Sequence, residues 1–114
     1  MENRKTISRI LQKPLQSRKS FFLLGPRGTG KTHWIKAALP QAVYIDLLDM
    51  DVYARLFAYP HQLADFIPKQ YRDWIVLDEV QRVPELLNEV HRLIEQEGHI
   101  FVLTRSSARS LRKK

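Results

Sequence analysis

Cysteine is absent from the 114-residue chain, which excludes disulfide scaffolds, thiolate metal sites and cysteine nucleophiles. Long apolar runs are absent as well: none approaches the roughly 18 residues of a membrane span, and no apolar segment of signal-peptide length follows Met1. The chain also lacks internal repeats, low-complexity tracts and Gly/Ser-rich linkers. With 44% hydrophobic and 27% charged residues, it has the composition of one small soluble domain, and we expect a cytoplasmic protein.

Acidic residues are scarce at both ends of the chain. The net charge is +7 over residues 1–31 and +5 over residues 105–114, whereas residues 32–104 carry −5. A basic protein invites a nucleic-acid hypothesis. Here the positive charge is divided between the two ends, and the first end contains the phosphate-binding motif described below, so nucleic-acid binding remains an alternative.

Short apolar runs alternate with segments of helical periodicity, which predicts an α/β layer fold with a mostly parallel sheet. Four apolar runs are expected to form strands: residues 21–24, 42–47, 74–77 and 100–103. Helices are expected at about residues 7–11, 31–39, 51–67 (one or two, broken at Pro60) and 84–97. The last helix is expected to present an apolar face made of Leu86, Leu87, Val90, Leu93 and Ile94, and to end at Gly98.

The strongest motif fits the pattern G-x-x-x-x-G-K-[ST] at every fixed position. Its residues are Gly25, Pro26, Arg27, Gly28, Thr29, Gly30, Lys31 and Thr32. Binding a triphosphate requires backbone N–H groups wrapped around anionic oxygens, and glycine permits that close approach. An apolar run precedes the motif and a helical pattern follows it, so the helix N-terminus adds a partial positive charge. We expect Lys31 to reach the β- and γ-phosphates and the Thr32 hydroxyl to bind Mg²⁺.

A pair of acidic residues ends the third apolar run. Asp78 follows Leu77 directly, and Glu79 comes next. A carboxylate at the carboxyl end of a buried strand is poorly placed for packing but well placed to hold a metal ion. We expect Asp78 to orient Mg²⁺, mostly through its waters and Thr32, and Glu79 to polarise the attacking water as a general base.

Hydroxyl residues follow the fourth apolar run. Thr104, Ser106 and Ser107 are expected at the sheet edge where a γ-phosphate would lie, and a hydroxyl there can bond the phosphate or the attacking water. The alternative is that Ser106 or Ser107 caps a local turn.

These motifs together resemble the nucleotide-binding domain of a family of bacterial and archaeal AAA-type P-loop ATPases. The resemblance covers Phe21 to Arg112 and includes the run Asp-Glu-x-Gln-x-x-Pro-Glu-Leu that begins at Asp78. It implies a three-layer P-loop fold and ATP and Mg²⁺ as cofactors. It also implies that Lys31 and Thr32 bind phosphate and metal, that Asp78 binds metal, that Glu79 acts on water, and that Thr104 or Ser106 is a polar sensor.

The sequence departs from the family pattern in two respects. Arg105 stands where the family usually has glycine, and it would strain the turn if that turn needs a positive φ. In addition, the family's strand order is 5-1-4-3-2 and a C-terminal nuclease-like domain typically follows, whereas only four strands are recognised here. We therefore expect a helical segment at residues 1–20 and a truncated AAA-type domain at residues 21–114, with the first strand left at the sheet edge.

The resulting functional prediction is an ATP·Mg²⁺-binding AAA-type domain with weak or absent hydrolysis. One alternative is a non-hydrolysing module that binds other protein subunits in response to nucleotide, and another is a basic nucleic-acid-binding fragment. Self-association is expected through the exposed first strand.

Overall fold

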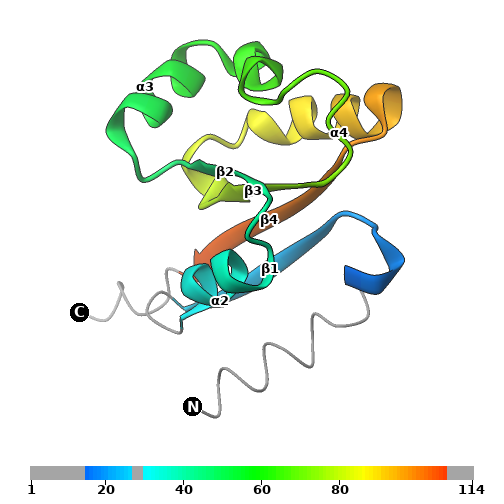
Figure 1. Cartoon of the computed structure of the whole chain (residues 1–114). Helices are drawn as coiled ribbons and strands as arrows, with labels where there is room; N and C mark the ends of the chain where they lie inside the picture. Colours follow the sequence, from blue (N-terminus) through cyan, green and yellow to red (C-terminus); the bar gives the residue numbers. More distant parts are fainter. Residues whose placement is uncertain (1–14, 27–29, 108–114) are drawn as a thin grey trace, which may run out of the picture.

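A four-stranded sheet forms the centre of the domain (Figure 1). The computed structural model describes residues 15–26 and 30–107, so the expected helix near residues 7–11 and the motif residues Arg27, Gly28 and Thr29 lie outside the described residues. The strands are β1 (Phe21–Pro26), β2 (Val43–Asp46), β3 (Trp74–Asp78) and β4 (Ile100–Ser107).

The strands lie in the order β1-β4-β3-β2, and every neighbouring pair is parallel. Phe21 is opposite Val102, so β1 is next to β4, as the strand order of the resembled family implied. Because all four strands run in the same direction, their carboxyl ends meet at one edge of the sheet. The predicted α/β fold with a parallel sheet is confirmed.

Helices cover both faces of the sheet (Figure 1). They are α2 (Lys31–Ala38), α3 (Met50–Ala58), the 3₁₀ turns η1 (Pro60–Phe66) and η2 (Val80–Arg82), and α4 (Leu86–Glu97). The Asp49 side chain caps α3 by accepting hydrogen bonds from the N–H groups of Asp51 and Val52. The expected break at Pro60 is present, since Pro60 opens η1. Gly98, with φ 72°, ends α4 as predicted.

The alternation of side chains along the strands divides the core into two parts. On one face, Ile75, Leu77 and Phe101 pack against buried residues of α3, η1 and α4. On the other face, Trp74 and Val76 pack with Ile35 of α2. Asp78 follows the same alternation as Trp74 and Val76, which directs its side chain to the α2 side of the sheet.

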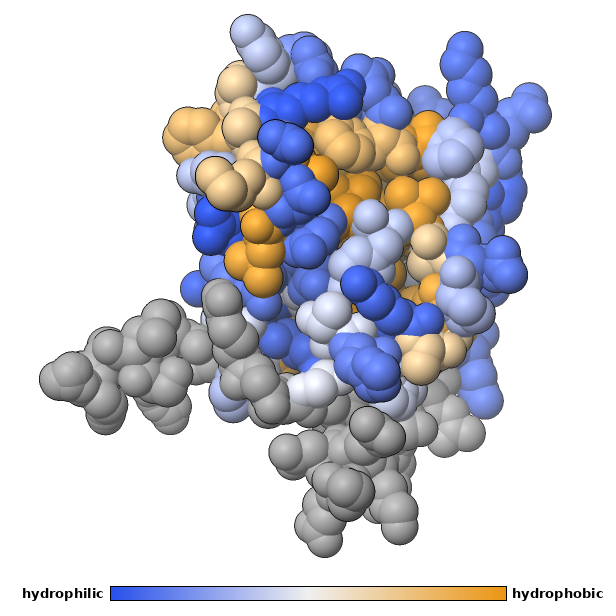
Figure 2. Space-filling view, turned by 60° about the vertical axis from the view of Figure 1, so that its left-hand side comes forward, coloured by the Kyte–Doolittle hydropathy of each residue, from blue (hydrophilic) through white to orange (hydrophobic). Residues whose placement is uncertain are grey.

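Apolar side chains also gather on the surface, where Figure 2 shows them bordered by hydrophilic ones. Phe22 and Leu24 of β1 are 48% and 65% exposed. They point to the face opposite α2, while the core of that face is built on β2, β3 and β4. Leu87 is also exposed, at 42%, so its expected place in the apolar face of α4 was wrong. No helix in the described ranges is long and apolar enough to cross a membrane.

Candidate functional site

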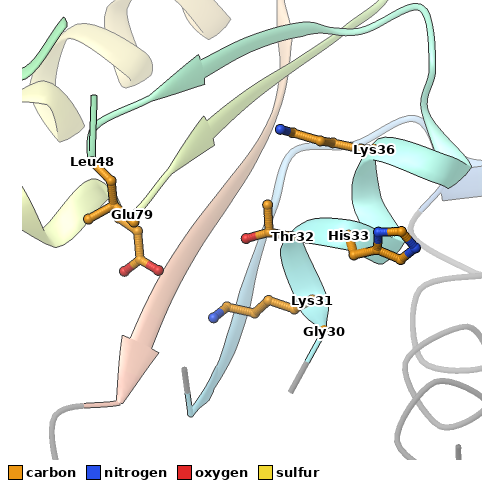
Figure 3. Close-up of a pocket in the computed structure, with 7 residues that line it drawn as sticks. All are labelled: Gly30, Lys31, Thr32, His33, Lys36, Leu48 and Glu79. Atoms are coloured by element: carbon orange, nitrogen blue, oxygen red, sulfur yellow. The ribbon is translucent and has the colours of Figure 1, made fainter. Parts of the chain in front are cut away.

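A cavity of about 420 Å³ lies beside the start of α2 (Figure 3), within the range that holds small ligands. Its lining residues are Gly30, Lys31, Thr32, His33, Lys36, Leu48 and Glu79. Except for Glu79 and Leu48, which follow β3 and β2, they come from the first turns of α2 and the residue before it. The cavity therefore opens at the carboxyl edge of the sheet, where the sequence predicted a phosphate site.

Gly30 sets the direction in which the chain enters α2. Its φ of 85° lies in the left-handed region that favours glycine, while an added Cβ would meet no atom within 4 Å. The requirement at this position is therefore conformational and does not come from crowding. The residues that follow, Lys31 and Thr32, form the first turn of α2 and direct their polar atoms toward the ends of β3 and β4 (Figure 3).

Asp78, at the end of β3, is 2% exposed and is surrounded by hydroxyl groups. Its Oδ2 accepts hydrogen bonds from Thr32 Oγ1, at 3.1 Å, and from Tyr44 Oη. Its Oδ1 accepts a hydrogen bond from Thr104 Oγ1. Buried carboxylates are usually paired with a cation, but within the described residues no Lys or Arg forms a salt bridge with Asp78. The neutral donors stabilise the carboxylate and leave its negative charge uncancelled.

Tyr44, on β2, was not singled out from the sequence. Burial, together with the hydrogen bond to Asp78 and its charge, raises the pKa of Tyr44 well above its ordinary value. The phenol is therefore protonated and acts as the donor in this bond. The only signal that could have pointed to it is register: Tyr44 is opposite Val76, and both share a sheet face with Asp78 two residues further on.

Glu79 leaves the strand in a left-handed conformation, with φ 65° and ψ 50°. This conformation is uncommon for a residue with a side chain and is found mainly at functional or strained positions. Its N–H donates to Thr104 Oγ1 at 2.9 Å. Its carboxylate, 3% exposed, accepts from Ser106 Oγ at 2.6 Å and from Gln81 Nε2 at 2.7 Å. Gln81 is the second residue whose contact was not expected from the sequence.

Lys31 joins this network through β4. Its amine, 5% exposed, donates to Ser106 Oγ at 3.1 Å. Thr104 and Ser106 point inward because they alternate along β4 with Arg105, whose side chain is exposed. Arg105 lies in the ladder opposite Leu24 and is not among the positive-φ residues, so the strain expected from its replacing glycine does not arise.

The structure thus brings six of the predicted site residues into one hydrogen-bonded network: Lys31, Thr32, Asp78, Glu79, Thr104 and Ser106. Gly25 and Pro26 end β1 opposite Ser106 and Ser107, beside that network.

The oxygen atoms at this site suit a hard cation that takes few ligands from the protein and the rest from water or phosphate. The part of the chain that is described contains no cluster of three or more His, Cys, Asp or Glu side chains. What it offers is one carboxylate, on Asp78, hydrogen-bonded to one hydroxyl, on Thr32. This set fits Mg²⁺, which binds few protein groups and completes its shell with water and phosphate oxygens.

Comparison with known proteins agrees with this geometry. A family model described as an AAA domain matches residues 17–114, which include the whole network. A search of the curated proteins gave no match. Since the matched range covers most of the chain and the predicted fold is present, the chain belongs to the AAA domain family and is a nucleotide-binding module of the AAA type.

Proposed function

We propose that this domain binds ATP together with Mg²⁺ in the cavity beside the start of α2. The observation that supports the proposal best is the hydrogen bond between Thr32 Oγ1, from the phosphate-loop motif, and Asp78 Oδ2, at the end of β3. Two motifs 46 residues apart in the sequence thereby form one oxygen-rich site, with a buried lysine beside it. A triphosphate and its magnesium ion need this combination of cation, hydroxyl and carboxylate.

In the proposed site, Lys31 supplies the positive charge nearest the β- and γ-phosphates. Thr32 and Asp78 hold Mg²⁺, which when bound neutralises charge on the phosphate oxygens. Asp78 does not line the cavity itself, so it acts through Thr32 and the waters of the ion. Gly30 and the first turn of α2 provide backbone N–H groups for the phosphates.

Replacing Lys31 with alanine tests ATP binding. ATP·Mg²⁺ at 100 times its dissociation constant stabilises a protein by about 2.7 kcal/mol, which is a shift in Tm on the order of 10 °C for a domain of this size. We expect Lys31→Ala to lose most of this shift. The matched control is Lys69→Ala, which removes an exposed lysine remote from the cavity and should keep the shift. An equal ATP-dependent shift in wild type and Lys31→Ala would refute the assignment.

We further propose that Glu79 is the general base for hydrolysis and that turnover is slow. Both carboxylate oxygens of Glu79 accept hydrogen bonds, one from Ser106 and one from Gln81. A water molecule that is to be activated by Glu79 has to compete with these two donors, which slows the reaction. An arginine from a partner subunit, which can add about 10³–10⁵ in rate, is also not part of the isolated chain. We expect turnover well below the enzyme median of about 10 s⁻¹.

A second candidate function is a module that binds partners in response to ATP and does not hydrolyse it. The hydrogen bonds that occupy both carboxylate oxygens of Glu79 favour this candidate. Steady-state phosphate release separates the two candidates. Release that depends on Glu79 supports a slow ATPase, while saturable ATP binding with no release supports the module.

A further inference from the structure

Tyr44 holds a position that none of the recognised motifs accounts for. It belongs to β2, and its hydroxyl donates to Oδ2 of Asp78, the oxygen that also accepts from Thr32. Tyr44 does not line the cavity, so it cannot act by touching a ligand there. Its hydroxyl therefore acts on the site through the side chains that it contacts, and Asp78 accepts its hydrogen bond.

The hydrogen bonds to Asp78 fix the plane of its carboxylate. Oδ2 accepts from both Tyr44 and Thr32, and Oδ1 accepts from Thr104. In the proposed site the Thr32 hydroxyl would bind Mg²⁺, and Tyr44 would then be the side chain that still holds Oδ2. A carboxylate held at one oxygen can rotate about its last bond, whereas one held at both oxygens has a single orientation. That orientation is the one in which Oδ2 lies 3.1 Å from the Thr32 hydroxyl. Groups that orient a metal-binding residue in this way affect metal affinity by about 10–100-fold.

The Tyr44 ring is itself held in place. The Lys36 amine, which lines the cavity, lies 4.7 Å from the centre of the ring. The ring packs, partly buried, against the core cluster that contains Trp74 and Val76. The hydroxyl therefore approaches Asp78 from a fixed direction.

We propose that Tyr44 is a positioning residue that prepares Asp78 and Thr32 for Mg²⁺. The inference rests on the proposed ATP·Mg²⁺ function and adds a residue from β2 to a site otherwise built from β3, β4 and α2. A phenol suits this role because it orients the carboxylate without cancelling its charge, so that the charge remains available to attract the cation. A lysine or arginine at the same place would compete with the metal.

The chain offers a matched control in Tyr71. Its hydroxyl accepts from the Val43 N–H and has two backbone carbonyl oxygens within hydrogen-bond distance to which it can donate, and it does not line the cavity. Tyr71→Phe therefore removes the same hydroxyl group from a purely structural position. It should lower Tm without altering how nucleotide affinity depends on Mg²⁺.

The test measures the dissociation constant of ATP by calorimetry, once with excess Mg²⁺ and once with EDTA. For Tyr44→Phe we expect affinity in Mg²⁺ to fall about 10-fold while affinity in EDTA stays within twofold of wild type. Tyr71→Phe should keep the wild-type ratio of the two constants. A Tyr44→Phe variant with the wild-type ratio would overturn the proposal.

A double-mutant cycle with Asp78→Asn gives a second measurement. If Tyr44 acts through the Asp78 carboxylate, Tyr44→Phe should have no further effect on the ratio once Asp78 is asparagine. A persisting effect would show that Tyr44 acts by another route and would overturn the proposal. Failure of the wild-type domain to bind ATP in either buffer would instead refute the proposed function itself, so the two failures are distinguishable.

Discussion

Replacing Thr104 with valine should destabilise the domain far more than its size suggests. Thr104 is fully buried, and its hydroxyl does two things at once. It donates to Oδ1 of Asp78 and accepts from the N–H of Glu79 at 2.9 Å. Valine has nearly the same shape but neither donor nor acceptor, so the substitution removes both bonds and leaves two buried polar groups without this partner.

The expected cost follows from those two groups. A hydrogen bond to a charged group contributes about 1.5–3 kcal/mol, and a buried N–H left without an acceptor costs about 1–3 kcal/mol. Together they give a loss of about 3–5 kcal/mol in the free energy of unfolding, near the upper limit for single substitutions. Thr104→Ser keeps the hydroxyl and removes one methyl group, at a cost of about 1 kcal/mol. The difference in the free energy of unfolding between the two variants gives the contribution of the Thr104 hydroxyl.

Urea titration followed by tryptophan fluorescence measures both variants without nucleotide, since Trp34 and Trp74 lie in or against the core beneath the site. With a slope of about 2 kcal/mol/M, a loss of 4 kcal/mol lowers the midpoint by about 2 M. A Thr104→Val variant within about 1 kcal/mol of Thr104→Ser would refute the reasoning, because it would show that water or relaxation replaces both hydrogen bonds.

Three further predictions concern other parts of the domain. Glu79→Gln should keep ATP binding and abolish phosphate release, because the amide cannot accept a proton; turnover unaffected by the change would contradict the role of Glu79. Gly30→Ala should cost about 1 kcal/mol in the free energy of unfolding despite open space around the position, because its φ of 85° strains an L-residue; an unchanged urea midpoint would contradict this. The wild-type chain should self-associate at micromolar concentration through β1, since the exposed Phe22 and Leu24 lie on a strand that pairs on one side only within the described residues. Light scattering should show less association for Leu24→Lys than for Leu87→Lys, an equally charged change at an exposed leucine of α4; equal association in both variants would exclude β1 as the contact.

The two central strands, β3 and β4, were predictable from the sequence because their apolar residues are buried on both faces of the sheet. The runs at residues 74–77 and 100–103 are continuously apolar, and β3 and β4 occupy them with Ile75, Val76, Phe101 and Val102 at 1% exposure or less. Strand ends were harder to predict. The apolar run at 100–103 stops four residues before β4 does, because Thr104 and Ser106 satisfy their hydroxyls inside the site and so continue the strand without apolar side chains.

One helix residue, Leu87, was wrongly expected to be buried. Leu87 fits the apolar spacing of α4, but the buried side of this helix is formed by Leu86, Val90 and Leu93, and Leu87 lies outside it. Spacing alone includes any apolar neighbour in the stripe, whereas the angle at which a helix meets the sheet decides which neighbour is buried. That angle depends on residues distant in the sequence.

Sequence motifs predicted some of the residues that meet at the candidate site but not all of them. That Lys31, Thr32 and Asp78 lie together at one edge of the sheet was predictable, because each belongs to a local pattern of residues with a chemical reason for its spacing. The contact of Tyr44 with Asp78 has no local pattern, since it joins β2 to β3 across 34 residues and depends on strand order and register.

The hydrogen-bond donors around Asp78 explain why the sequence motifs did not reveal Tyr44. A buried carboxylate needs several donors to offset its lost hydration, and a single cation would provide that most simply. In this domain the nearby cation, Lys31, donates to Ser106, while Asp78 is held by three hydroxyls from α2, β2 and β4. Hydroxyls lower the cost of burial without cancelling the carboxylate's charge, which suits the proposed Mg²⁺ site because a bound cation would be attracted by that charge. Spreading the donors over three elements also makes the site depend on the complete fold, which is why a stretch of sequence around Asp78 reveals the carboxylate but not the groups that prepare it.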